Sequence, residues 1–233
     1  MDKMFDTLTA GLRSMELCLP EGADRKLCDF GNAVVEQNKV MNLTAITEPE
    51  AVAKLHLLDS VSLLKCQDLA GKRLIDVGCG AGFPGVPVKI ACPQVELTLL
   101  DSLGKRMNWL ATILPQLGVE AKCITARAEE AAADLRESYD FASSRAVARL
   151  NVLLELTAPF VKVGGAVLAM KGSAAAEELE EAQNAISKLG LKLESVHHFP
   201  VDGADHAVIV LRKVRPTPAQ YPRRYAKIKQ FPL

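Results

Sequence analysis

The feature that most constrains the fold is the stretch from Leu74 to Ile90, which reads LIDVGCGAGFPGVPVKI. It begins with an apolar run typical of a buried strand, continues through Gly78, Gly80 and Gly82, and ends in residues that suit the start of a helix. Glycines in such a turn let the chain reverse and let a ligand approach the backbone, because they carry no Cβ atom. The stretch therefore predicts a ligand cradle between a strand and a helix.

Two acidic residues frame this cradle. Asp76 precedes the glycines in the pattern D-x-G-x-G-x-G, and Asp101 closes the next apolar run. A carboxylate at the end of the second strand can accept hydrogen bonds from both hydroxyls of a ribose. The arrangement resembles the S-adenosylmethionine (SAM) site of Rossmann-like methyltransferases, with Asp76 expected to face the ligand. Because Gly80 to Gly85 also fits G-x-G-x-x-G, a dinucleotide site stays open as the alternative.

Length and composition limit the protein class. The chain has 233 residues, of which 49% are hydrophobic, and it contains no apolar run of about 18 residues and no signal-peptide pattern. We therefore expect a soluble, cytoplasmic protein with one large core. The six cysteines form no C-x-x-C pair, which argues against a zinc site and against a disulfide framework, so no metal is expected.

The order of elements predicts the architecture. Within residues 1–70, apolar residues show helical spacing over 4–19, 23–41 and 49–64. We expect these helices to form an N-terminal helical cap, with Thr47 as the N-cap of the last one. From residue 71 strands (73–77, 96–100, 121–125, 139–144, 165–170) alternate with helices (84–91, 104–117, a short one from 128, 150–161, 174–189), as in a doubly wound parallel sheet. Two further strands, 191–199 and 207–214, joined by a turn at 201–205, predict an antiparallel edge strand. The result is an α/β, mostly parallel seven-stranded sheet over 71–215, of the methyltransferase type.

The C-terminal tail, residues 216–233, is basic. After Asp205 the chain has no acidic residue, whereas seven basic ones follow: Arg212, Lys213, Arg215, Arg223, Arg224, Lys227 and Lys229. Such a segment suits a polyanion as partner, although a solvated basic tail is the alternative.

The end of the fourth strand indicates which atom is methylated. Enzymes that methylate exocyclic amines of bases carry [N/D]-P-P-[Y/F] there, whereas this chain reads SSRA from Ser143 to Ala146. Cytosine C5 chemistry needs a cysteine nucleophile, and none follows Cys123. A ring nitrogen such as guanine N7 needs no base, only hydrogen-bond donors that hold the base and its phosphates. Arg145, Arg149 and Lys171 at neighbouring strand ends can supply them.

Seven motifs together resemble one family. They are NLTA from Asn42, HLLDS from His56, DVGCGAGFPGVP from Asp76, LDSLGKR from Leu100, RAE from Arg127, SRA from Ser144 and MKG from Met170. Their order and spacing resemble the bacterial 16S ribosomal RNA guanine-N7 methyltransferase family, also called glucose-inhibited division protein B or small-subunit ribosomal RNA methyltransferase G. The tail keeps YPRR from Tyr221 but lacks the Gly-x-Pro that usually follows in the family.

The resemblance implies an activity and a set of site residues. The activity is transfer of a methyl group from SAM to N7 of a guanine in the 530 loop of 16S ribosomal RNA, as free RNA or in an assembling small ribosomal subunit. The implied cofactor contacts include the residues of the cradle and are Asp76, Gly78, Gly80, Gly82, Phe83, Asp101, Ala128, Glu129 and Arg145. The residues expected near the guanine are Asn42, His56, Arg145 and Lys171. The residues expected to contact the RNA are Arg149, Arg223, Arg224 and Lys227. The competing hypotheses are an NAD-dependent oxidoreductase and a SAM-binding RNA-associated protein without turnover.

Overall fold

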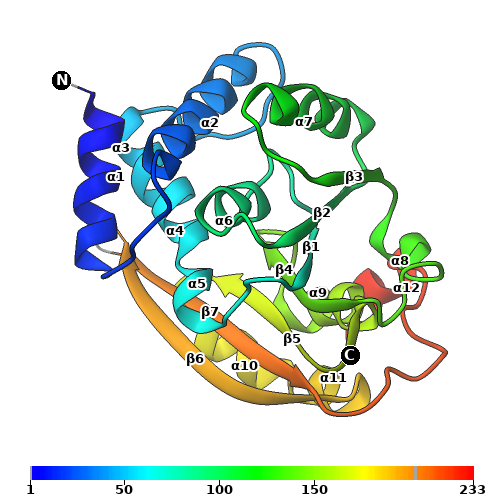
Figure 1. The fold of residues 1–233 in the computed structure, drawn as a ribbon. Helices are drawn as coiled ribbons and strands as arrows, with labels where there is room; N and C mark the ends of the chain where they lie inside the picture. The colour runs from blue at the N-terminus through cyan, green and yellow to red at the C-terminus, as the bar shows by residue number, and fades with distance from the viewer. Residues whose placement is uncertain (1, 202–203) are drawn as a thin grey trace.

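A computed structural model describes residues 2–201 and 204–233, which form a twisted sheet with helices on both faces (Figure 1). The strands are β1 Arg73–Val77, β2 Glu96–Asp101, β3 Lys122–Thr125, β4 Tyr139–Arg145, β5 Val161–Lys171, β6 Leu191–Val201 and β7 Ala204–Lys213. The helices are α1 Lys3–Ser14, α2 Ala23–Asn38, α3 Pro49–Val52, the π-helix η1 Ala53–Leu58, α4 Asp59–Val61, α5 Leu63–Cys66, α6 Gly85–Ala91, α7 Gly104–Gln116, α8 Ala128–Ala131, α9 Leu150–Thr157, the 3-10 helix η2 Ala158–Phe160, α10 Ala175–Glu181, α11 Gln183–Lys188 and α12 Tyr225–Gln230.

The strand order is β3-β2-β1-β4-β5-β7-β6, and β1 to β5 run parallel. β7 pairs antiparallel with both β5 and β6, so the antiparallel strand lies inside the sheet and β6 forms the edge. The expectation of an antiparallel edge strand was therefore wrong. After the crossover through α10 and α11, β6 runs parallel to β5 but is not its neighbour. β7 lies between the two strands. The turn predicted at 201–205 includes residues 202 and 203, which lie outside the described residues.

Alternating side chains on the strands separate two hydrophobic cores. On β5, Ala166, Leu168 and Met170 pack with the N-terminal helices, α6 and α7, whereas Val167 and Ala169 pack with α9, α10 and α11. This period of two is what a sheet covered on both faces requires. The first core extends from α1 to β7, so the N-terminal helical cap shares its core with the sheet.

Two predicted helices differ from those in the structure. The predicted helix 49–64 begins after Glu48, which makes no side-chain capping bond, so Thr47 is not its N-cap. The same helix widens into the π-helix η1 in its middle, and a π-turn cannot be read from apolar spacing. The predicted helix 174–189 is divided at Ala182 into α10 and α11.

Within the described parts of the chain, no helix has both the length and the apolar character needed to cross a membrane. Over the same residues, no group of three or more His, Cys, Asp or Glu side chains is arranged to hold a metal ion.

Candidate active site

The turn between β1 and α6 is fixed from behind by Asp76. This carboxylate is fully buried, and its two oxygens accept hydrogen bonds from the Gly85 backbone N–H (2.8 Å) and from the Ser143 hydroxyl (3.1 Å). Burial raises the pKa of Asp76 to about 7. A Cβ atom on Gly85 would lie 2.9 Å from Asp76 Oδ2, so only glycine lets the helix start this close. Asp76 thus shapes the cradle from behind; it was expected to face the ligand, and it is not among the lining residues of the small cavity described next.

The front of the turn borders a small cavity of about 180 Å³ at the ends of β1 and β2. Asp101, which is 8% exposed, accepts hydrogen bonds there from the Gly80 N–H (3.0 Å) and the Leu103 N–H (2.9 Å). Gly78 has a φ of +70°, and a Cβ on it would lie 2.5 Å from Cγ2 of Val147. The cavity is lined by Val77, Gly78, Leu100, Asp101, Ser102, Ala126, Arg127, Ala128, Glu129, Val147, Leu156 and Tyr225. Four predicted cofactor residues, Gly78, Asp101, Ala128 and Glu129, therefore meet in one place.

Gly82 and Phe83 lie deeper. A Cβ on Gly82 would approach Val86, Leu110 and Phe30, so this glycine serves the packing of α6 and α7. The Phe83 ring is 5% exposed and stacks on the His56 ring, with 4.6 Å between the centroids. Phe83 thus supports the wall of a second cavity.

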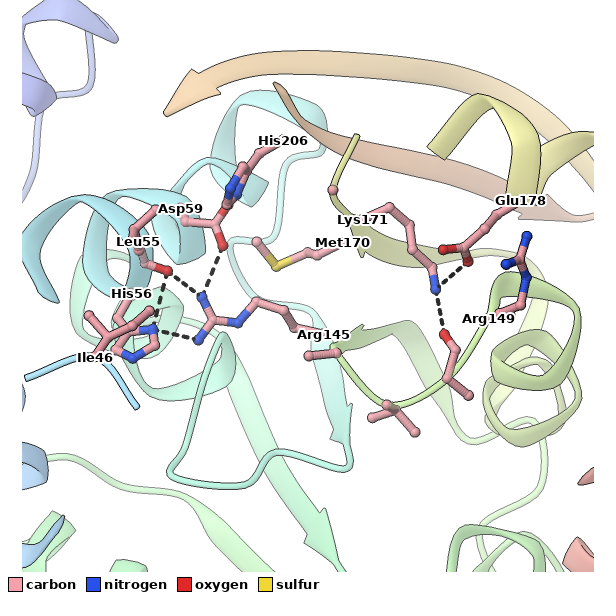
Figure 2. A pocket seen from close by; sticks show the side chains of 14 residues that line it. Ile46, Leu55, His56, Asp59, Arg145, Arg149, Met170, Lys171, Glu178 and His206 are labelled. Atoms are coloured by element: carbon pink, nitrogen blue, oxygen red, sulfur yellow. Dashed lines mark hydrogen bonds and ion pairs between the residues drawn. The ribbon is translucent and has the colours of Figure 1, made fainter. Parts of the chain in front are cut away.

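This second cavity has a volume of about 650 Å³ (Figure 2). Its lining residues are Ile46, Leu55, His56, Asp59, Arg145, Ala146, Val147, Ala148, Arg149, Met170, Lys171, Gly172, Glu178 and His206. Val147, on the loop after β4, lines both cavities. A ligand group in the cradle and a second ligand in the larger cavity would therefore meet at this loop.

Arg145 reaches from the end of β4 to the helical segment of the cap (Figure 2). Its Nη1 donates to the Leu55 carbonyl (2.8 Å) and to Asp59 Oδ2 (2.9 Å), and its Nη2 lies 3.1 Å from His56 Nδ1. The π-helix makes this possible, because the Asp59 N–H bonds to the carbonyls of Lys54, five residues earlier, and of His56, and not to that of Leu55. The widened turn thus directs a carbonyl, an imidazole and a carboxylate at one guanidinium.

His56 is the neutral member of this group. His56 Nδ1 lies 3.1 Å from the Arg145 guanidinium, which can only donate, and 3.2 Å from the Leu55 carbonyl, which can only accept. We assign the shorter contact as the hydrogen bond, so Nδ1 accepts from Arg145 and the proton is on Nε2, which lies 2.8 Å from the Thr44 hydroxyl oxygen. Burial and the neighbouring Arg145 charge lower the pKa of His56 to about 4. At neutral pH this imidazole is therefore uncharged, and its one acceptor nitrogen is already engaged in a hydrogen bond.

The other residues predicted near the guanine are placed differently. Lys171 donates to the Ala148 carbonyl (2.6 Å) and pairs with Glu178 (2.8 Å), so it holds the loop after β4. Arg149 lines the larger cavity, half exposed, and pairs with Glu177 and Glu181. Asn42 is exposed and is not among the lining residues of this cavity; its carbonyl accepts from Arg106 Nη2 at 3.3 Å.

The predicted RNA-binding residues of the tail fall into two groups. Arg223 makes a two-pronged ion pair with Glu155, a fully buried carboxylate of α9, at 2.6 and 2.8 Å. Arg224 and Lys227 are exposed. Arg223 therefore anchors the tail, whereas the other two point to solvent.

Among the lining residues that were not predicted as site residues, Asp59 and His206 stand out because they are linked to Arg145. Asp59 stands in the HLLDS motif, but nothing in the sequence places its side chain against Arg145. His206 comes from β7, 147 residues away, and its Nδ1 lies 2.9 Å from Asp59 Oδ1. Only the sheet order brings these two side chains together. The hydrogen bond to Asp59 raises the pKa of His206 above its usual value.

Sequence comparison identifies relatives over nearly the whole chain. Residues 23–207 match the family described as rRNA small subunit methyltransferase G. The chain is 42% identical over 232 residues to the ribosomal RNA small subunit methyltransferase G of Alkaliphilus metalliredigens, covering 97% of each protein. It is 39% identical over 237 residues to that of Clostridium botulinum, covering 99% of each.

Solved structures share the fold at low sequence identity. A putative methyltransferase from Bacillus halodurans superposes with a TM-score of 0.56 at 14% identity, covering 67% of this chain and 99% of that one. M. jannaschii TYW2, solved in complex with AdoMet, gives a TM-score of 0.54 at 14% identity, covering 67% of this chain and 77% of that one. The predicted Rossmann-like methyltransferase fold is thereby confirmed.

Proposed function

The chain belongs to the rRNA small subunit methyltransferase G family, and we propose that it methylates N7 of a guanine in 16S ribosomal RNA with SAM as the methyl donor. The substrate region is the 530 loop, presented by free RNA or by an assembling small subunit. An NAD-dependent oxidoreductase finds no support, because the family is one of methyltransferases.

The residues around the smaller cavity suit the cofactor. Asp101 stands at the end of β2, where a carboxylate can accept from ribose hydroxyls, and Gly78 leaves the backbone open to close approach. Ala128 and Glu129 border the same space at the start of α8. Bound SAM supplies a methyl group attached to a positively charged sulfonium. A nucleophile attacks this methyl group in line, and S-adenosylhomocysteine leaves with a neutral sulfur.

The observation that carries the choice of a ring nitrogen is the set of charges in the larger cavity. Its two lining carboxylates are both paired, Asp59 with Arg145 and His206, and Glu178 with Lys171. His56 is neutral and its acceptor nitrogen is taken. Neither lining carboxylate nor His56 is therefore free to remove a proton, and His206 holds its Nδ1 against Asp59, which raises the pKa of His206 and favours its protonated form. Guanine N7 carries a lone pair and needs no deprotonation, so such a cavity suits it.

Arg145 is the residue we place at the guanine. Three of its five N–H groups bond to described residues, which leaves two donors for a substrate. A guanine presents O6 and N7 as acceptors on one edge, and phosphates present more. Arg145 is therefore proposed to orient the base or its phosphate beside the Val147 loop, so that N7 meets the methyl group. Alignment of this kind is the main source of rate in a displacement that needs no base.

The test is transfer of a tritiated methyl group from SAM to 16S ribosomal RNA, offered once as a naked transcript and once as a small subunit assembled from it. The modified position is then mapped by borohydride reduction and aniline cleavage, which cut RNA at 7-methylguanine. We expect one cleavage site, in the 530 loop. Label in a ribose or an exocyclic amine would refute the assignment to N7. Tight cofactor binding without any transfer would favour the binding protein without turnover.

A further inference from the structure

The C-terminal tail is fastened to the catalytic domain by several buried contacts. Arg223 holds the buried Glu155 through its side chain and its backbone N–H (2.9 Å). Ile228 is fully buried against Val152 and Leu156 of α9. Before these contacts, the Arg136 guanidinium bonds to the carbonyls of Thr217, Pro218 and Tyr221. The tail therefore docks as a fixed part of the fold, with α12 lying beside α9 (Figure 1).

This docking brings Tyr225, the first residue of α12, to the small cavity. Tyr225 lines it together with Gly78, Asp101 and Glu129. The Arg127 guanidinium lies 4.5 Å from the centre of the Tyr225 ring, and Arg127 Nε donates to Glu129 at 2.6 Å. A cation on the ring and an ion pair behind it hold the aromatic ring in place.

We infer that Tyr225 is a cofactor-binding residue that packs against the adenosine part of SAM, so that the tail completes the cofactor site. The inference rests on the proposed function for its cofactor. A purine has two flat faces, and an aromatic ring is the side chain that best packs against one of them. The cavity supplies carboxylates at its polar end, from Asp101 and Glu129, and Tyr225 adds the aromatic surface.

A neighbouring hollow enlarges the space open to a ligand at Tyr225. The small cavity has a volume of about 180 Å³, below the roughly 300–1,000 Å³ of ordinary ligand pockets. A further hollow of about 470 Å³ shares Arg127, Glu129 and Tyr225 with it. Tyr225, in the anchored tail, therefore stands where the two hollows meet.

The experiment measures the dissociation constant of S-adenosylhomocysteine by calorimetry, without RNA, for the wild type and three variants. Tyr225→Ala should weaken binding by about tenfold, the loss expected for one ring stacked on a base. Tyr225→Phe keeps the ring and should bind like the wild type. Phe231→Ala removes a tail aromatic that is 60% exposed and should have no effect. Circular dichroism melting establishes that each variant is folded.

Hydrogen exchange of the wild type with and without S-adenosylhomocysteine gives a second measurement that needs no variant. Amides of residues 221–230 should exchange more slowly with the ligand bound. Equal affinity of the wild type and Tyr225→Ala, or tighter binding by the variant, would show that the ring is not a contact and overturn the inference alone. If Tyr225→Ala fails to fold, unchanged exchange in 221–230 overturns it. A wild type that binds no S-adenosylhomocysteine overturns the proposed function, and this inference falls with it.

Discussion

Arg145 and Asp59 form an ion pair at 2.9 Å between the end of β4 and the helical cap, with side chains only 16% and 6% exposed. His206 holds the second oxygen of the same carboxylate. Because the guanidinium also reaches Leu55 and His56, its position is determined by three acceptors on one helical segment. The N-terminal cap thus fixes the orientation of a residue that belongs to the sheet.

Substituting Arg145→Lys should remove most methyl transfer while the fold and most cofactor affinity remain. An ammonium group cannot reach Leu55, Asp59 and His56 together as a planar fork does, so the donors offered to substrate would move. A misplacement of about 1 Å can cost about 10²-fold in rate. The measurement is kcat with tritiated SAM, and Arg25→Lys, an exposed ion pair with Asp2, is the matched control. Wild-type turnover of the lysine variant would remove Arg145 from the centre of the site.

Asp59→Asn should act through Arg145 and His206. The variant keeps an oxygen but loses the negative charge, so we expect kcat to fall by about tenfold, with KM changed less. The pKa of His206 is raised by its bond to Asp59 and should fall in the variant. In the wild type, the stabilisation from this pair is complete below the ordinary histidine pKa of about 6.5 and is lost as the pH rises through the raised value.

An NMR titration of His206 in both proteins measures this shift directly. An unchanged His206 pKa together with an unchanged kcat would mean that Asp59 positions neither residue.

Asp101→Ala should weaken cofactor binding by about 1–3 kcal/mol, because ribose hydroxyls and two loop N–H groups would lose their acceptor. Calorimetry with S-adenosylhomocysteine measures the loss, with Asp134→Ala, an exposed carboxylate, as control. Melting of the wild type should rise with SAM and not with NAD. A rise with NAD alone would contradict the cofactor assignment.

Charge reversal should separate the two kinds of tail cation. Arg224→Glu with Lys227→Glu should weaken RNA binding at low salt and flatten its salt dependence, because exposed cations contact phosphates and release counterions. The charge reversal should not by itself change the affinity for the cofactor. Unchanged RNA affinity would leave these residues as solvated surface charges.

Arg223→Glu should instead destabilise the protein by about 3–5 kcal/mol, because it leaves the buried Glu155 without its partner and adds a like charge. Urea unfolding measures this loss. A stability equal to that of the wild type would show that the tail is not fastened by this ion pair.

Asp76→Asn should change how stability depends on pH. The folded-state pKa is raised to about 7, so the folded carboxyl keeps its proton between about pH 4 and 7 while the unfolded one loses it. The contribution of the Asp76 carboxyl to the free energy of unfolding is therefore largest at low pH in the wild type. It declines by about 1 kcal/mol per pH unit as the pH rises across that window. The stability of the variant relative to the wild type should rise from pH 4 to 7 and then stay constant. Urea unfolding across this range is the measurement, with Asp134→Asn as control; parallel curves would exclude the effect.

The sequence by itself determined the local structure of the core elements and predicted four residues that line one cavity in the structure. Apolar runs ending in Asp76 and Asp101, with glycines between, predict β1, β2 and the cradle, because strand, turn and helix start depend on neighbouring residues. Gly78, Asp101, Ala128 and Glu129 meet for the same reason, since the carboxyl ends of parallel strands share one edge.

Only the tertiary structure decided which polar groups are free and which are engaged. His206 joins Asp59 because β7 inserts between β5 and β6, and the π-turn at η1 directs His56 and Asp59 to Arg145. Arg223 is held in an ion pair with the buried Glu155, whereas Arg224, its neighbour, is exposed. The physical reason is that a long side chain takes its role from partners far away in the chain, and those partners are fixed by packing and strand order, which local residue patterns do not contain.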